Sequence, residues 1–308
     1  MEIIDHPSQL QAEGRRVCVA VGVFDGVHLG HQQVLRQTLA DAQQFEGIPV
    51  AITFDRHPAC VLAPEHAPRM IYPLEKKLAT IESLGVRHAY VIPFDQAFSE
   101  RTGEDFITGL VADFGNLASI CVGSAFTFGH QRSGDVKLLR ELGAKHGFQV
   151  HGLAAVSLDD EAVSSTRIRA AITGGDLDAA GQMLGRAYTL GGPVIQGAQL
   201  GCQLGFPTAN IDVSELATPP HGVYAVHIGA GDRSWRAALN IGVRPTVREA
   251  EPTLHVEAHL LDFDGDLYDE KLEITFVKHL RPEQKFPDLN ALCEQIAADV
   301  ATTRTAFG

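Results

Sequence analysis

The hydrophobic pattern of the chain changes once, near residue 184, and this change constrains the fold more than any other feature. Before it, short apolar segments alternate with helical stretches; after it, short strand-like segments are separated by glycine, proline and aspartate turns. Alternation predicts a parallel sheet covered by helices on both faces. Closely spaced short strands predict a small antiparallel barrel or sandwich. We expect an α/β domain over residues 1–183 and a β domain over 184–308.

The expected elements follow from the local periodicity. In the first half the predicted strands are 16–24, 48–54, 88–94, 118–123 and 148–156, and the predicted helices are 31–47, 74–85, 102–114 and 164–186. In the second half the predicted strands are 188–197, 221–229, 233–243, 254–261 and 271–280, followed by a closing helix over 287–307. A ligand crevice is expected at the carboxyl ends of the parallel strands.

The composition limits what such a chain binds. Its 308 residues carry a net charge of −13, and the acidic excess is shared by both halves. This charge disfavours nucleic acid as a partner. The five cysteines are scattered, without a CxxC pair, as is usual in a reducing compartment. No segment resembles a membrane span or an export signal. We expect a soluble cytoplasmic protein that has no structural metal and no membrane contact; the sequence is compatible with an oligomer.

Two histidines, His28 and His31, follow the first apolar segment in "VGVFDGVHLGH". They lie between a predicted parallel strand and the helix that follows it. The N-terminus of a helix offers unpaired N–H groups and a partial positive charge. Gly26 and Gly30 permit close approach of backbone to a ligand. The motif therefore predicts a nucleotide phosphate site. The ordinary alternative is one buried and one surface histidine beside a turn.

A second motif, "VSSTRIR", strengthens this hypothesis. Ser165 and Thr166 suit a helix N-cap, and Arg167 and Arg169 lie in the first turn, where cations oppose the helix dipole. An anion such as a triphosphate would explain these arginines. A solvated arginine pair is the alternative.

Together, "GVFDGVHLGH", "TFDRHP", "VGSAFTFGHQRSGD" and "VSSTRIR" resemble the adenylyltransferase half of the bacterial bifunctional riboflavin kinase/FMN adenylyltransferases, or FAD synthetases. The motifs "GFPTANI", "PHGVYAV", "NIGVRPT", "VEAHLLDFDGDLY" and "LRPEQKF" resemble the kinase half of the same family, in the same order. The resemblance implies a Rossmann-like HxGH nucleotidyltransferase domain followed by a riboflavin kinase barrel. It also implies the substrates ATP, riboflavin and FMN, with Mg²⁺ accompanying ATP and flavin serving as substrate and product.

The resemblance also implies site residues in the first domain. His28 and His31 would act on the ATP phosphates. The remaining ATP-binding residues would be Gly22, Phe24, Asp25, Gly26, Gly30, Ser165, Thr166 and Arg169. Flavin would lie near Ala125 and Phe126. The reaction would be attack of the FMN phosphate on the α-phosphorus of ATP, which requires alignment and charge neutralisation above all.

In the second domain, Thr208 and Asn210 alternate along "GFPTAN", so both side chains point to one side. Their oxygens suit Mg²⁺ that also binds nucleotide phosphates. The resemblance makes Glu257 the catalytic base that accepts the riboflavin 5′-hydroxyl proton. It adds a nucleotide and flavin site with members Gly201, Gly205, Pro207, Thr208 and Asn210. The ordinary alternative for Thr208 and Asn210 is a proline-containing turn before a strand. For Glu257 it is an exposed strand position.

Three positions depart from the family pattern: Arg56 replaces a common proline, Cys202 a common arginine, and Ala125 an Asp or Asn near the flavin. Losing a side-chain hydrogen bond at Ala125 would cost about 1 kcal/mol. Two alternatives therefore stay open: a riboflavin kinase whose first domain has lost adenylyltransferase activity but still binds nucleotide or flavin, and a non-catalytic flavin-binding protein. Further on, "DFDGDLYDEKLE" lacks calcium-loop spacing, and Asp264-Gly265 predicts a hairpin turn.

Overall fold

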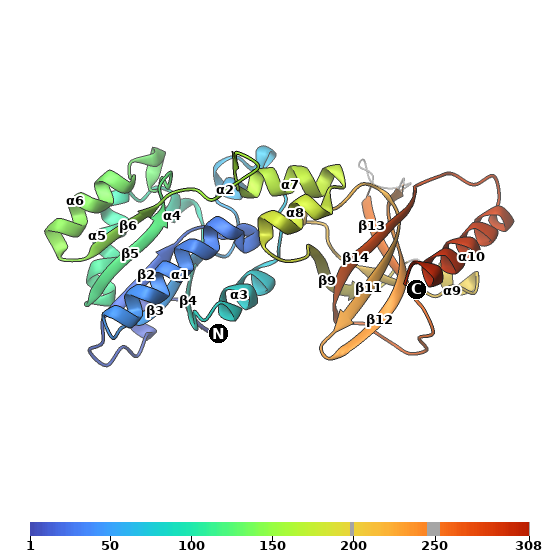
Figure 1. The fold of residues 1–308 in the computed structure, drawn as a ribbon, viewed down its shortest axis with the longest axis horizontal. Coiled ribbons are helices and arrows are strands. Elements are labelled where there is room, and N and C mark those ends of the chain that lie inside the picture. Colours follow the sequence, from blue (N-terminus) through green and yellow to red (C-terminus); the bar gives the residue numbers. More distant parts are fainter. Residues whose placement is uncertain (198–199, 245–252, 308) are drawn as a thin grey trace. The chain divides into compact units, whose positions relative to one another are not determined.

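Six parallel strands form the sheet of the N-terminal half, as the alternation of strands and helices predicts (Figure 1). The structure is a computed structural model that describes residues 1–197, 200–244 and 253–307. In sheet order the strands are β1 (Glu2–Ile4), β4 (His88–Ile92), β3 (Ile48–Phe54), β2 (Val17–Val21), β5 (Leu117–Gly123) and β6 (Gln149–Leu153). The five strands predicted for this half are confirmed as members of the sheet, and the short edge strand β1 was not predicted. The two-residue strands β7 (Ser157–Leu158) and β8 (Glu161–Ala162), which pair outside this sheet, were not predicted either.

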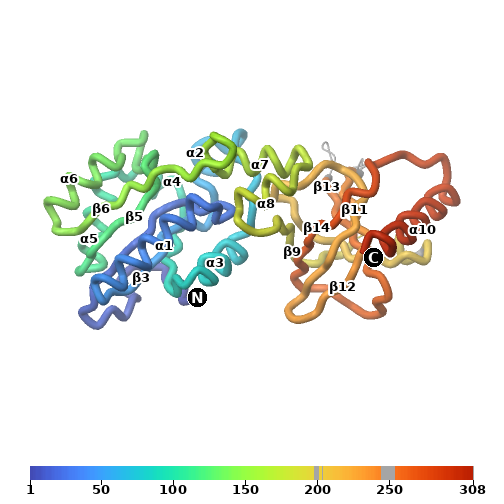
Figure 2. Tube along the Cα trace, viewed as in Figure 1, coloured from blue at the N-terminus to red at the C-terminus, as the bar shows by residue number. Residues whose placement is uncertain are grey.

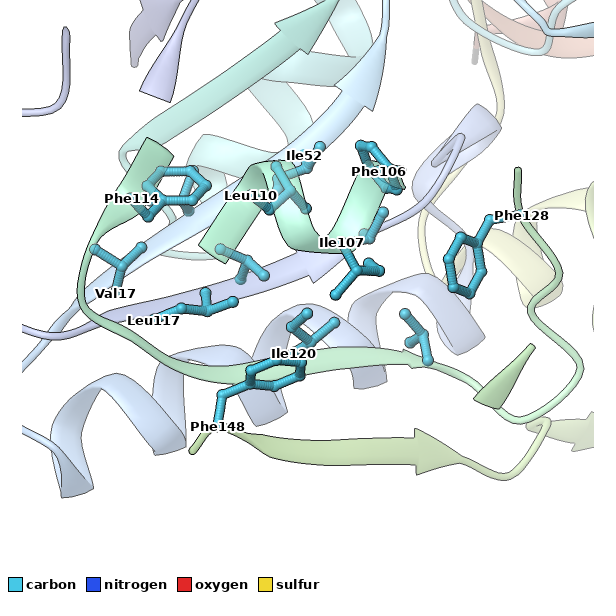
Figure 3. Packing of buried hydrophobic residues seen from close by; sticks show 14 of the residues in the cluster. Val17, Ile52, Phe106, Ile107, Leu110, Phe114, Leu117, Ile120, Phe128 and Phe148 are labelled. Atoms are coloured by element: carbon cyan, nitrogen blue, oxygen red, sulfur yellow. The ribbon is translucent and has the colours of Figure 1, made fainter. Parts of the chain in front are cut away.

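Helices cover both faces of this sheet, because side chains along a buried strand alternate between the two. Val17, Val19 and Val21 of β2 belong to a cluster with α5 (Gly103–Phe114) and α6 (Val136–His146). Figure 3 shows α5 side chains packed over the sheet in this cluster. On the opposite face, Ala20 of β2 packs with α1 (Leu29–Gln44) and α3 (Leu74–Ser83).

Several short elements complete this half. They are η1 (Pro7–Gln9), η2 (Asp25–Val27), α2 (Ala59–Leu62), η3 (Pro64–His66), α4 (Gln96–Ser99), η4 (His130–Arg132), β7 (Ser157–Leu158) and β8 (Glu161–Ala162). The helical stretch expected over 164–186 is two helices, α7 (Ser165–Gly174) and α8 (Leu177–Leu184). They are separated at Gly175, whose φ of 85° is left-handed and unsuited to a continuing helix.

The C-terminal half is a closed antiparallel barrel and not a sandwich, the other architecture that the strand spacing allows. Its order is β10 (Ala209–Ile211), β13 (Thr253–Leu260), β12 (Arg233–Arg244), β11 (Gly222–Ala230), β14 (Lys271–Pro282) and β9 (Thr189–Ile195), and β9 pairs with β10 to close the ring. A short helix α9 (Leu200–Gln203) precedes β10, and the final helix α10 (Leu289–Ala306) packs against β11, β12 and β14. Figure 2 lets the reader follow the chain from β14 into α10. Part of the "NIGVRPT" motif, residues 245–246, lies outside the described residues.

The hairpin expected at Asp264-Gly265 is wrong. Strand β13 pairs with β12 and β10, whereas β14 pairs with β11 and β9. The segment 261–270 is therefore a loop that connects two strands which do not pair with each other. Asp264-Gly265 lies in a loop, as turn-forming residues do, but which strands pair depends on contacts throughout the barrel.

The chain divides into two compact units that interleave in sequence. The first comprises Met1–Arg167 and Met183–Gly185; the second comprises Ile168–Gln182 and Arg186–Gly308. The functional boundary expected between residues 183 and 184 stays a prediction.

Candidate active sites

The loop between β2 and α1 has an unusual backbone. Phe24 and Val27 adopt left-handed conformations with φ of 53° and 42°, and Gly26 has φ of 75°. For a non-glycine residue this costs roughly 1 kcal/mol or more, so the surroundings must hold the loop. Asp25, which is 1% exposed, provides one anchor because its carboxylate accepts the N–H of Ile71 at 2.9 Å. Asp25 therefore fixes the shape of the predicted phosphate loop.

The two histidines of the motif lie against each other at the start of α1. Their rings stack with centroids 3.6 Å apart and an interplanar angle of 21°. Nδ1 of His28 accepts the N–H groups of Gly30 at 3.2 Å and of His31 at 3.4 Å. Two of the N–H groups expected to be unpaired are thus used within the protein. Because an accepting Nδ1 carries no proton, the ring proton of His28 is on Nε2.

Gly30 and Gly22 make this arrangement possible by lacking side chains. A Cβ on Gly30 would lie 3.2 Å from Cε1 of His28, and one on Gly22 would lie 3.0 Å from the ring of Phe24. The ring of Phe24 in turn meets His31 edge-on at 5.3 Å. These residues therefore shape the histidine pair through packing.

His31 is held in its neutral form. Burial lowers its pKa well below the usual value, and the nearby His28 and Lys77 lower it further. Its Nδ1 is buried and has no hydrogen-bond partner among the described residues. A neutral imidazole can donate a hydrogen bond from one nitrogen, which suits contact with a phosphate oxygen.

The "VSSTRIR" motif reaches the same loop through Ser165, whose hydroxyl donates to the carbonyl of Asp25 at 3.0 Å. The expected N-cap is wrong by one residue. Ser164 caps α7, since its Oγ accepts the N–H of Arg167 at 3.2 Å, and Ser165 and Thr166 lie in the first helical turn. Capping by Ser164 leaves the Ser165 side chain to bind the loop.

The two arginines of this motif differ. The guanidinium of Arg167 binds the carbonyl of Leu158 at 2.8 Å and the carboxylate of Glu161 at 3.2 Å. The anion that balances the charge of Arg167 is thus the Glu161 carboxylate of the β7–β8 hairpin, and not the triphosphate expected from the sequence. Arg169 lies further along α7, in the part of the helix that belongs to the second unit.

The residues expected to contact flavin lie after β5. Ala125 is exposed, and the partly buried ring of Phe126 stacks on Phe128 at 5.3 Å with an interplanar angle of 17°. Phe128 continues to Phe106 of α5 at 6.2 Å. An aromatic row therefore leads from the buried cluster of Figure 3 to the surface at Phe126. Flat aromatic surfaces of this kind suit a planar ring system.

The second unit contains a cavity of about 420 Å³. Thr208 and Asn210 line it, as the motif predicts, and residues 263–268 of the β13–β14 loop form another part of its wall. This loop was not predicted as part of the site, because Asp264-Gly265 had been expected to form a hairpin turn. The complete lining is Val194, Cys202, Pro207, Thr208, Ala209, Asn210, Leu260, Phe263, Asp264, Gly265, Asp266, Leu267 and Tyr268.

Glu257 lies beside the cavity, directly opposite Asn210 in the register of β10 and β13. On its other side it is opposite Asn240 of β12. Directly opposed residues share one face of a sheet. The alternating neighbours, such as Leu239 and Ala258, are fully buried in the barrel, so the row of Asn210, Glu257 and Asn240 faces outward. A residue 47 positions away thus joins the Thr208–Asn210 segment.

The turn before β10 depends on its glycines. A Cβ on Gly201 would lie 2.4 Å from the carbonyl oxygen of Phe206, so only glycine fits there. Gly205 has φ of 85° and open space around it, so its contribution is conformational. The carbonyl of Pro207 is 2.8 Å from Nδ1 of His259 on β13. These contacts hold the segment that presents Thr208.

The donors in the cavity fit a hard divalent cation that is bound partly by a nucleotide. Hydroxyl, amide and carboxylate oxygens from Thr208, Asn210, Asp264 and Asp266 line it, and Mg²⁺ prefers such oxygens together with phosphates. Across residues 1–197, 200–244 and 253–307, no three His, Cys, Asp or Glu side chains form a metal-binding group. Within the same residues no helix is both long and apolar enough to cross a membrane.

Two family models match this chain, one in each half. The family model for FAD synthetase matches residues 10–167, and that for riboflavin kinase matches residues 184–307. Proteins named bifunctional riboflavin kinase/FMN adenylyltransferase are 37% identical in Pseudomonas fluorescens and 35% in Escherichia coli, each over 99% of this chain and at least 96% of the relative. A crystal structure from Streptococcus pneumoniae, described as a macrolide-efflux protein, superposes with a TM-score of 0.81, at 27% identity over 98% of both chains.

Proposed function

The chain belongs to the family of bifunctional riboflavin kinase/FMN adenylyltransferases, and we propose that it converts riboflavin to FMN and FMN to FAD, using one ATP in each step. We assign adenylyl transfer to residues 1–183 and phosphorylation to residues 184–308. The observation that carries the proposal is the pairing of Asn210 with Glu257 beside a cavity that fits a nucleotide and its metal.

For phosphorylation, Glu257 accepts the proton of the riboflavin 5′-hydroxyl as this oxygen attacks the γ-phosphorus of ATP and ADP leaves. Thr208 and Asn210 would hold Mg²⁺ together with the ATP phosphates, and this ion would neutralise their charge. Asp264 and Asp266 carry negative charge in the same cavity. They favour a nucleotide that enters with its cation over the free polyanion.

For adenylyl transfer, an FMN phosphate oxygen attacks the α-phosphorus of ATP, the bond to the β-phosphate oxygen breaks, and pyrophosphate leaves. Nε2–H of His28 donates to a phosphate oxygen. His31 stacks on His28 and keeps its ring in place. Pre-aligned donors of this kind stabilise the charge that develops in the transition state. Thr166 and Arg169 are proposed to bind the pyrophosphate end. Ser165 acts on the loop, through its bond to Asp25.

The flavin ring is proposed to lie on Phe126, near Ala125. We also propose a cytoplasmic location and no nucleic-acid partner. The acidic net charge supports the second proposal. The cysteines at exposed positions, Cys60 and Cys202, are free thiols, which supports a reducing compartment.

The test is a chromatographic time course of purified protein with riboflavin, ATP and Mg²⁺. We expect FMN to appear first and FAD to follow. FMN that accumulates, with no FAD from added FMN, would show that the first domain has lost its reaction. Flavin that binds without consumption of ATP would contradict both activities.

A further inference from the structure

A lysine side chain is buried beneath the loop that carries the two histidines. Lys77 of α3 is 1% exposed. Its Nζ donates to the carbonyl of Phe54 at 2.9 Å, to Oγ1 of Thr53 at 3.1 Å and to the carbonyl of Val23 at 3.2 Å. An ammonium has three N–H donors, and here all three have acceptors within the protein.

The three acceptors lie where a ligand is expected. Val23 follows β2 and begins the loop to His28, whereas Thr53 and Phe54 end β3, the neighbouring strand. These are carboxyl ends of parallel strands, the edge at which such sheets bind ligands. Thr53 Oγ1 also donates to the carbonyl of Val23 at 3.0 Å. Lys77 thus ties both strand ends and the start of the histidine loop to α3.

The surrounding charges show what the ammonium does beyond packing. Burial lowers the pKa of Lys77 to about 8, although the carboxylates of Asp25 and Asp55 act to raise it. The imidazole of His31 is a further titratable group that the charge of Lys77 reaches. The charge of Lys77 disfavours a proton on His31. A buried ammonium is costly to desolvate, and an apolar side chain could fill the space without that cost.

We propose that Lys77 is a positioning residue for adenylyl transfer: its three hydrogen bonds fix the start of the Val23–His28 loop, which carries the histidine pair. The inference rests on the adenylyltransferase activity proposed above. Because all of its donors are used, Lys77 acts through the loop and the histidines.

The test compares full-length wild type with Lys77→Met and Lys77→Arg. For FMN adenylylation we expect Lys77→Met to lower kcat by about 10- to 100-fold, as misplacement of reacting groups does. Riboflavin phosphorylation should be unchanged, because its residues lie in the other unit. Lys137→Met is the matched control, since Lys137 is a lysine of the same unit with its side chain 84% exposed.

The pH dependence of the adenylylation rate shows whether the charge of Lys77 matters or only the packing of its side chain. Wild-type adenylylation should fall as pH rises through about 8, because Lys77 then loses its proton. Lys77→Arg keeps its charge and should lack this fall. In Lys77→Met, the NMR titration of the His31 ring should move to higher pH. Thermal unfolding checks that each variant is folded.

Three results would overturn the inference: a wild-type profile that is flat between pH 7 and 9.5, the same alkaline fall in Lys77→Arg, or a folded Lys77→Met with wild-type kcat. Failure of the underlying activity looks different. In that case wild type forms FMN but no FAD at any pH.

Discussion

At the residue scale, Gly30 determines whether the His28 ring can fold back over the first turn of α1. With no Cβ there, the ring accepts two backbone N–H groups and stacks on His31. Within a helix, glycine lowers the stability of the helix relative to alanine. Glycine at position 30 therefore lowers the stability of the helix but leaves room for the His28 ring. A substitution there should change activity and folding stability in opposite directions.

We expect Gly30→Ala to lower FAD formation about 10-fold while leaving the unfolding temperature unchanged or raised. The added Cβ would lie 3.2 Å from the His28 ring and displace it, whereas alanine favours the helix by up to about 1 kcal/mol. Adenylylation assays and thermal melts measure the two effects. Gly174→Ala, with no heavy atom within 4 Å of its Cβ, is the control. Unchanged FAD formation would contradict the packing argument.

Glu257 allows a second test at this scale. Glu257→Gln keeps the shape of the side chain but cannot accept the hydroxyl proton, so FMN formation should fall about 100-fold or more. Adenylylation of supplied FMN should continue at the wild-type rate. Glu294→Gln, at an exposed position of α10, controls for loss of a carboxylate. Loss of both activities in Glu257→Gln would refute the assignment of separate sites.

At the scale of elements, the loop 261–270 shows what local sequence signals leave out. Asp264-Gly265 marks a turn, yet the register that joins Asn210 to Glu257 and inserts β14 between β11 and β9 depends on contacts between distant segments. In the same way, helix α3 is predicted and Lys77 was missed. A clue was present: Lys77 lies three residues after Leu74 and four before Ile81, on the apolar face of its helix.

The loop is anchored at its start, and we expect this anchor to affect nucleotide binding. Asp262 and Arg304 of α10 form two hydrogen bonds of 2.7 and 2.8 Å, and these bonds lower the pKa of Asp262. Asp262→Asn should raise the KM for ATP in riboflavin phosphorylation about two- to fivefold, with little change in kcat, because an exposed pair contributes little. Steady-state kinetics measure this. Asp269→Asn, in the same loop, should behave as wild type; an equal effect there would argue against the anchor.

At the scale of the whole molecule, the two-part fold follows from the sequence because strand–helix alternation and short-strand spacing are local signals. The motifs likewise predict residues that the structure brings together: His28 stacks on His31, and Thr208 and Asn210 line one cavity. How the two units share the chain does not follow, because it depends on which side chains pack together. Leu184 is fully buried and belongs to the first unit, although about 150 residues separate it from α1. Its carbonyl accepts Nε2 of Gln32 at 2.8 Å.

Leu184→Ala should therefore destabilise the first unit by about 2–4 kcal/mol, the usual effect of a cavity in a core. It should also reduce FAD formation, because Cδ2 of Leu184 lies 3.2 Å from the position of a Cβ on Gly26 in the phosphate loop. Denaturant unfolding followed by both activity assays measures this, with riboflavin phosphorylation retained. Leu62→Ala, at a position that is 62% exposed, is the control. A Leu184→Ala protein as stable as wild type would contradict the argument.

The chain passes between its two units three times, after residues 167, 182 and 185. Two genes joined end to end would need only one such passage. Any single recombination point therefore separates part of one unit from the rest, so a chimera of two relatives inherits a unit of mixed parentage. A chimera that exchanges one complete unit and keeps the other would therefore need junctions at all three passages.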